Sequence, residues 1–315
     1  MVGAIAALAL LSAGAASQAA PAPAPAQPPS AAMAAGPAAV LLLQSDFGLQ
    51  DGAVASLKGV AYTVSPTLQV VDLTHLITPF NIMEAAYRLR QVAPFWPAGT
   101  VFVSVVDPGV GTKRHSVVLR TKTGQYFVTP DNGTLTFVAE IFGVAEVREI
   151  DESVNRRPGS EWSATFHGRD VYVYTAARLA AGIITFEQVG PSRGTEYVAL
   201  AVPPAQANAD SARGTIVTLD QPYGNLWTNI DTSSVTAAGF KVGDRVRVRI
   251  SHGKTAVWSD VVFYGRTFGD VPLGRPVLYV NSLDRLALAL NQGNFAKRYA
   301  ISAGEDWTLE LVKNP

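Results

Sequence analysis

Three side chains suited to proton and anion chemistry lie beside sharp turns in this chain. Asp107 follows the apolar run 100–106 and opens the sequence Asp-Pro-Gly-Val-Gly-Thr-Lys-Arg, which ends at Arg114. Its proline and glycines predict a tight turn. His167 stands in Phe-His-Gly-Arg-Asp, just before an apolar helical pattern. A carboxylate, a guanidinium and an imidazole in such positions indicate a catalytic pocket rather than a packing device.

A second carboxylate follows another apolar run. Asp46 comes directly after the run 38–45, as Asp107 comes after its own. Ligands of open α/β sheets bind beyond the carboxyl ends of the strands, so two such aspartates favour a lined site over two simple turns. Asp131, in Pro-Asp-Asn-Gly, fits an ordinary turn and a site residue equally well.

Each histidine of the chain could have a structural role instead of a catalytic one. A lone histidine is more often structural, but His167 adjoins Arg169 and Asp170, and burying such charges without purpose would be costly. We expect His75 to be structural, because its sequence neighbours offer no evident partner. The chain contains neither His-Glu-x-x-His nor Gly-x-Ser-x-Gly, so a metal site of that kind and an acyl-transfer serine are unsupported.

The second half of the chain offers a further set of candidates. The segment 220–229 is a polar, aromatic stretch that we expect to be a loop, and Phe268 and Ser282 follow it. Asn225 near Trp227 suits the binding of a flat heteroaromatic ring. The asparagine would hydrogen-bond to the edge of the ring, and the tryptophan would stack on its face. These aromatic residues could equally plug the end of a barrel.

Composition excludes several classes of partner. The chain has 315 residues, is 48% hydrophobic and 16% charged, and has no formal net charge. It lacks the electrostatic footprint of a nucleic-acid or anionic-membrane binder, which favours a small neutral or zwitterionic ligand. Cysteine is absent, so disulfides, thiolate nucleophiles and cysteine-ligated metals are excluded.

The N-terminus resembles an export signal. Residues 1–19 hold a short apolar run followed by small residues, and 20–37 form a tether rich in proline and alanine. We therefore expect a periplasmic or secreted protein. A cytoplasmic protein with a disordered tail is the alternative, because no lysine or arginine lies near Met1.

The rest of the chain predicts two domains. Apolar strands alternate with helices in residues 38–200, for example around helices at 52–63, 82–92 and 171–181, which indicates a mostly parallel sheet flanked by helices. Residues 201–213 read as a linker. Short strands separated by turns in 214–315 predict a smaller, antiparallel, barrel-like β domain. The fold class is α/β followed by β.

Seven segments occur in the order found in a known family. They read Ser-Asp-Phe-Gly, Asp-Leu-Thr-His, Asp-Pro-Gly-Val-Gly-Thr-x-Arg, Pro-Asp-Asn-Gly, Phe-His-Gly-Arg-Asp, Tyr-Gly-Asn-Leu-Trp-Thr-Asn and Asn-Ser. In this order the chain, from about Val40 to Leu311, resembles the S-adenosylmethionine (SAM) hydrolases that form adenosine. These enzymes, also called hydroxide adenosyltransferases, are relatives of fluorinating and chlorinating enzymes.

The resemblance implies that water attacks C5′ of the ribose and displaces L-methionine, with no cofactor and no metal. It implies a homotrimer with each site between two subunits, and a small-molecule substrate as the partner. Asp107, Arg114 and His167 would bind and activate the water. The implied substrate-binding residues are Asp46 on the ribose hydroxyls, Asn225, Trp227 and Phe268 on the adenine, Asp220 on the methionine ammonium, and Ser282 on its carboxylate.

Three departures separate the chain from the halogenating relatives. Those enzymes carry an insertion after Asp-Pro-Gly-Val and a halide-binding serine where this chain has Gly168, so water is favoured over halide. They also have arginine where this chain has Leu283, which leaves the carboxylate contact to Ser282 and backbone. A SAM-dependent nucleoside halogenase and an exported, non-catalytic binder of adenosine or SAM remain the alternatives.

Overall fold

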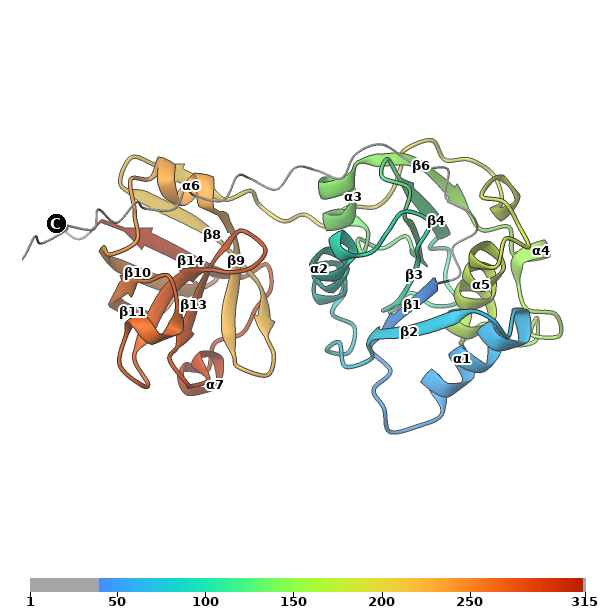
Figure 1. The fold of residues 1–315 in the computed structure, drawn as a ribbon, viewed down its shortest axis with the longest axis horizontal. Coiled ribbons are helices and arrows are strands. Elements are labelled where there is room, and N and C mark those ends of the chain that lie inside the picture. Colours follow the sequence, from blue (N-terminus) through green and yellow to red (C-terminus); the bar gives the residue numbers. More distant parts are fainter. Residues whose placement is uncertain (1–39, 314–315) are drawn as a thin grey trace, which may run out of the picture. The chain divides into compact units, whose positions relative to one another are not determined.

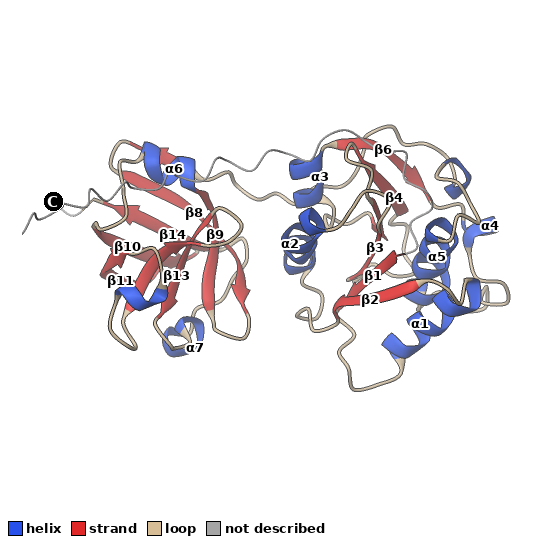
Figure 2. Cartoon of the chain, viewed as in Figure 1, coloured by secondary structure: helices blue, strands red, loops and turns tan. Residues whose placement is uncertain are grey.

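The computed structural model describes residues 40–313, and the expected signal and tether lie outside this range. Figures 1 and 2 show an N-terminal α/β part and a C-terminal β part. None of the helices among residues 40–313 has the length and apolar character that crossing a bilayer requires.

The N-terminal part is built on a mixed sheet in the order β2-β1-β3-β5-β4-β6. Its strands are β1 (Val40–Ser45), β2 (Gln69–Thr74), β3 (Val101–Val105), β4 (Ser116–Thr121), β5 (Tyr126–Pro130) and β6 (Val144–Glu149). The pairs β1–β2, β1–β3 and β3–β5 are parallel, whereas β4 runs antiparallel to both β5 and β6. The expectation of a mostly parallel sheet is confirmed.

Helices cover both faces of this sheet (Figure 1). The helical segments are α1 (Ala53–Val64), α2 (Ile82–Val92), a 3₁₀ turn (Ala93–Phe95), α3 (Thr136–Phe142), α4 (Glu152–Asn155), a π-helical turn (Gly168–Val173), α5 (Tyr174–Ala180) and a 3₁₀ turn (Glu187–Val189). Side chains of α1 and α5 share one apolar core with Leu41 and Leu43, and those of α2 and α3 share another with Leu42. This alternation along β1 places consecutive residues on opposite faces of the sheet.

Local sequence explains where α2 begins. The side chain of Asn81 accepts a hydrogen bond from the backbone N–H of Glu84 at 2.9 Å, as expected of an N-cap. Such a cap contributes about 1 kcal/mol to helix stability. Pro94 lies in the 3₁₀ turn that follows the helix.

The C-terminal part is a closed β-barrel, which confirms the barrel-like domain. Its elements are β7 (Gln206–Asn208), β8 (Ser211–Asp220), β9 (Asn225–Asp231), α6 (Thr232–Ala237), β10 (Arg245–His252), β11 (Thr255–Tyr264), a 3₁₀ turn (Phe268–Asp270), β12 (Pro276–Val280), β13 (Arg285–Leu290), α7 (Phe295–Tyr299) and β14 (Trp307–Val312). The sheet runs β14-β10-β11-β12-β13-β9-β8-β7, and β14 also pairs with β8, which closes the barrel.

Three details differ from the sequence expectation. The segment 201–213, expected to be a linker, contains β7 and the beginning of β8. The pair β11–β12 is parallel, although an antiparallel domain was expected. The expected loop 220–229 is a turn followed by β9, because its residues from Asn225 on pair with both β8 and β13.

Candidate active site

The turn after β3 brings Asp107 and Arg114 together. Val110 N–H donates to the carbonyl of Asp107 at 3.2 Å and Thr112 N–H donates to that of Gly109 at 3.1 Å, which folds the chain back on itself. Gly111 has a φ of +75°, a conformation that glycine adopts without strain. The glycine-rich sequence therefore forms the predicted turn, and Arg114 returns to the end of the strand that Asp107 follows.

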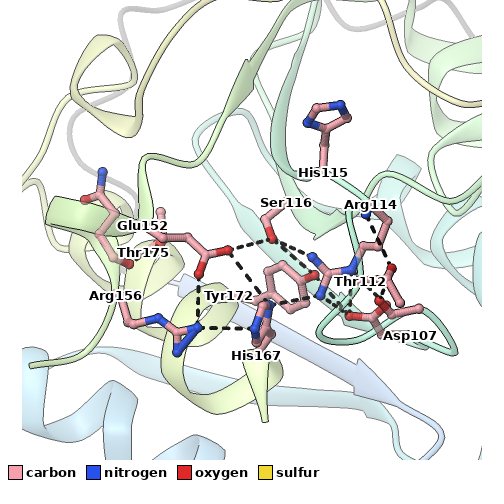
Figure 3. Close-up of polar contacts among 12 residues, drawn as sticks. Asp107, Thr112, Arg114, His115, Ser116, Glu152, Arg156, His167, Tyr172 and Thr175 are labelled. Carbon is pink, nitrogen blue, oxygen red and sulfur yellow. Dashed lines mark hydrogen bonds and ion pairs between the residues drawn. The ribbon is translucent and has the colours of Figure 1, made fainter. Parts of the chain in front are cut away.

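Arg114 makes a multiple ion pair with Asp107 (Figure 3). Its Nε donates to Oδ1 at 3.0 Å and to Oδ2 at 3.1 Å, and its Nη2 donates to Oδ2 at 2.6 Å. The side chains are only 11% and 5% exposed. Burial opposes the charge of Arg114 most, but the hydrogen bonds with Asp107 and the nearby anionic groups together outweigh it and raise the pKa of the guanidinium.

His167 contacts this pair from a segment much later in the sequence. Arg114 Nη2 lies 3.0 Å from His167 Nδ1, and the imidazole side chain is 8% exposed. Burial lowers the pKa of His167, so the ring is neutral around pH 7. Asp107, Arg114 and His167 thus converge, although 60 residues of sequence separate the first from the last.

A π-helical turn presents His167. The ring belongs to the residue directly before the turn Gly168–Val173, a distortion common at functional sites. Asp170 within the turn is fully buried and is held by Arg157 and Arg169, at 2.8 Å and 2.7 Å. The two charged neighbours of His167 in the sequence, Arg169 and Asp170, therefore pair with each other and fix the backbone beside His167.

Other side chains complete the polar cluster in Figure 3. Tyr172 Oη donates to Asp107 Oδ2 at 3.1 Å, and burial together with the Asp107 charge raises the pKa of this phenol well above its usual value. Ser116 Oγ accepts from Arg114 Nη1 at 2.8 Å. Sequence reasoning missed both residues, because neither stands in a recognisable motif.

Asp46 lines the same cavity as Asp107 and His167. Its Oδ2 accepts a hydrogen bond from the backbone N–H of Phe80 at 2.8 Å. The cavity has a volume of about 260 Å³. Its lining residues are Asp46, Phe47, Pro79, Phe80, Val105, Asp107, Val110, Thr165, Phe166, His167 and Gly168.

Part of the second candidate set lines a separate cavity of about 800 Å³ in the barrel. Asp220, Asn225 and Phe268 lie there, and Asn225 Nδ2 donates to Asp220 Oδ2 at 3.0 Å. Within residues 40–313, this cavity and the one beside His167 have no lining residue in common.

The structure places two predicted contact residues elsewhere. Trp227 is 7% exposed, and its Nε1 donates to Tyr279 Oη at 3.3 Å, so its ring packs in an apolar cluster instead of lining the barrel cavity. Ser282 is exposed and lines a different cavity.

Asp131 and His75 both contact residues outside the Asp107–Arg114–His167 cluster. Asp131 Oδ1 accepts from the backbone N–H of Val198 at 2.7 Å, which favours the structural interpretation. His75 is structural as expected, but the expectation that it has no evident partner near it in the sequence was wrong. Its Nδ1 lies 2.7 Å from Ser45 Oγ and its Nε2 lies 3.2 Å from Asp72 Oδ1.

Comparison with known proteins agrees with this arrangement. The family model of the SAM hydroxide adenosyltransferase N-terminal domain matches residues 41–190, and that of the C-terminal domain matches residues 214–308. The chain is 35% identical over 263 residues to a protein of Salinispora arenicola named (R)-S-adenosyl-L-methionine hydrolase, covering 83% of this chain and 94% of the relative. It is 32% identical over 289 residues to a fluorinase of an Actinoplanes species, covering 84% and 95%.

A solved structure shows the same fold. The crystal structure of a conserved protein from Thermotoga maritima, described as uncharacterized, superimposes with a TM-score of 0.77 at 34% identity, covering 87% of this chain and 100% of that one. These matches extend over both domains and include the Asp107, Arg114 and His167 segments. The chain belongs to the SAM hydroxide adenosyltransferase family.

Proposed function

We propose that this protein hydrolyses S-adenosyl-L-methionine to adenosine and L-methionine. The observation that carries the proposal is the convergence of Asp107, Arg114 and His167 beside a cavity that also contains Asp46. The names of the hydrolase relatives support the same reaction class.

The proposed step is a displacement at C5′ of the ribose. The water oxygen forms a bond to C5′ while the C5′–S bond breaks, and the electron pair of that bond goes to sulfur. The sulfonium thereby leaves as the neutral thioether of methionine, so we propose that no metal or cofactor assists its departure. The water loses one proton, which the carboxylate of Asp107 accepts, and adenosine is released.

The residues supply position and charge balance in this step. Arg114 orients the carboxylate of Asp107, which accepts the proton, and neutral His167 contacts Arg114 through Nδ1 without adding a positive charge. We assign Asp46 to the ribose hydroxyls, because its carboxylate is at the cavity wall and is oriented by the Phe80 N–H. Holding water in line with the C5′–S bond contributes the rest of the rate.

We propose that the barrel cavity binds the remainder of the substrate in a homotrimer. The cavity beside His167, about 260 Å³, is small for the whole of SAM, whereas the barrel cavity is about 800 Å³. Asp220 would bind the methionine ammonium, while Asn225 and Phe268 would contact the adenine. The two cavities would then meet between neighbouring subunits. We also propose that residues 1–19 are an export signal, which the mass of the mature N-terminus in the native source would test.

Halogenation is the second enzymatic candidate, and Gly168 disfavours it. A Cβ atom at this position would lie 2.8 Å from Cγ1 of the buried Val105, which is closer than packed atoms approach. A halide-binding serine therefore does not fit here unless the Val105 side chain shifts.

The test is direct. Purified protein is incubated with SAM, and adenosine and methionine are separated by chromatography, with His167→Ala as the control. Adenosine formation above that control supports the proposal, and a 5′-halogenated nucleoside in chloride or fluoride buffer would favour a halogenase. Tight SAM binding without turnover would instead indicate the exported binder.

A further inference from the structure

A second guanidinium faces His167 on the side away from Arg114 (Figure 3). Arg156 Nη2 lies 3.2 Å from His167 Nε2, while Arg114 Nη2 lies 3.0 Å from Nδ1. Each ring nitrogen therefore has a guanidinium nitrogen within hydrogen-bond distance. This arrangement is not part of the Asp107–Arg114–His167 motif, because Arg156 comes from a separate segment at the end of α4.

The chemistry of these groups restricts the protonation of the ring. A guanidinium only donates hydrogen bonds, and a neutral imidazole has one acceptor nitrogen and one N–H. One arginine can therefore donate to the lone pair while the other faces the ring N–H. A second proton would place an N–H against a guanidinium on both sides and would add a third positive charge to the group.

Arg156 is held in this position by two contacts besides His167. Its Nη2 lies 3.0 Å from Glu152 Oε2, and its Nη1 donates to the carbonyl of Ser163 at 3.2 Å. Its side chain is 12% exposed. An arginine anchored at both ends of its guanidinium is a fixed part of the pocket wall rather than a free surface side chain.

We propose that Arg156 is a positioning residue, anchored by Glu152, that together with Arg114 holds His167 as an oriented, neutral imidazole. The link to catalysis rests on the proposed function, in which the neutral ring is the active form. The arrangement explains why a histidine next to two carboxylates stays uncharged, since each carboxylate is already paired with an arginine.

The charged and titratable groups around the ring come from three segments. The loop after β3 contributes Asp107 and Arg114, α4 and its end contribute Glu152 and Arg156, and the π-helical turn contributes Tyr172. Burial lowers the pKa of His167 most, Arg114 and Arg156 lower it further, and Glu152 and Asp107 oppose them.

The experiment is an NMR titration of the imidazole signals. The chain has four histidines, so a His167→Gln spectrum identifies the signal of His167 by its loss. Arg156→Gln should move the titration midpoint of His167 to higher pH, because it removes a cation at Nε2. Glu152→Gln should move it to lower pH. Arg249→Gln is the control, since Arg249 lies in the barrel, in an exposed ion pair with Glu310, and should leave the midpoint unchanged.

Kinetics provide a second readout. In Arg156→Gln the acid limb of the pH profile of kcat/KM should move to higher pH with the NMR midpoint, kcat should fall by up to about 100-fold, and KM should change little. Arg156→Lys keeps the charge and a donor, so its midpoint should lie closer to that of the wild type.

An Arg156→Gln midpoint equal to that of Arg249→Gln overturns the proposal. If Arg156→Gln does not fold, as judged by its thermal melt, an unchanged midpoint in Glu152→Gln overturns it instead. Absence of adenosine formation by the wild type would overturn the proposed function alone, because the NMR titration does not depend on turnover.

Discussion

The guanidinium of Arg114 donates three hydrogen bonds to the carboxylate of Asp107 across a turn of seven residues. This pair is buried, so its two charges depend on each other. Removing one partner would leave the other unpaired in a site with little solvent, which costs several kcal/mol in comparable buried pairs. The geometry of the proposed water site and the stability of the turn are therefore linked.

Asp107→Asn should lower kcat for adenosine formation by about 10²- to 10⁴-fold, because the variant loses the negative charge that balances Arg114 and assists proton removal. It should also lower the melting temperature. Asp210→Asn is the matched control, because Asp210 forms an exposed ion pair with Lys313. A kcat within twofold of wild type in Asp107→Asn would contradict the assigned role.

Gly168→Ser should destabilise the protein by about 1–3 kcal/mol, because the new Cβ meets Val105. Denaturant unfolding measures this loss. Combining the change with Val105→Ala removes the contacting methyl groups, so the double variant should lose less stability than the sum of the two single changes. An additive loss would show that the contact with Val105 is not the cause.

Ser45→Ala should cost about 1–3 kcal/mol of unfolding free energy, because Ser45 Oγ contacts His75 Nδ1 and accepts from the Phe47 N–H in a buried position. Since Asp46 lies between Ser45 and Phe47, KM for SAM should rise as well. Ser65→Ala, at an exposed hydroxyl, is the control. Unchanged stability and KM would show that this hydrogen bond does not hold the Asp46 corner.

Acid should destabilise the protein through its buried histidines. Burial lowers the pKa of both His75 and His167 below the ordinary value of 6.5. The unfolded chain therefore binds more protons than the folded one as the pH falls below 6.5, and the unfolding free energy decreases over that range. Urea unfolding between about pH 8 and pH 5 measures the slope. His167→Gln should make it shallower, and an equal slope would contradict a neutral His167.

Mixed assemblies test whether each site is shared between subunits. Asp107→Asn and Asp220→Asn should each be inactive alone, because one alters the cavity beside His167 and the other the barrel cavity. In a randomly mixed trimer, about one quarter of the sites would combine two intact halves, so activity should return. No activity above that of the single variants would place both halves of the site in one subunit.

Local patterns predicted the elements whose signals lie within a few residues. Asn81 caps α2 as expected, and Gly111 supports the turn that its neighbours indicated. The polar and aromatic residues of the segment with Asn225 and Trp227 predict a loop. Its pairing with β8 and β13, which the sequence does not display, makes it a strand.

The site could be predicted only as far as its motifs extend. Asp107, Arg114 and His167 stand in recognisable segments, whereas Arg156 contacts His167 from a segment without one. The spacing of Glu152 and Arg156, four residues apart, was the available signal for their ion pair. One partner of His75, Ser45, could not be predicted because the fold brings it to the ring, whereas the other, Asp72, stands three residues before His75 in the sequence.

The pairing of β14 with β8 also constrains how the chain is made. The barrel needs β14, which follows all of its other strands in the sequence, so on the ribosome this domain stays open until residues 307–312 have been made. The α/β domain has all its strands much earlier and can begin to fold first. A premature stop codon just before Trp307 would remove the strand that seals the barrel and expose the edges of β8 and β10 to aggregation.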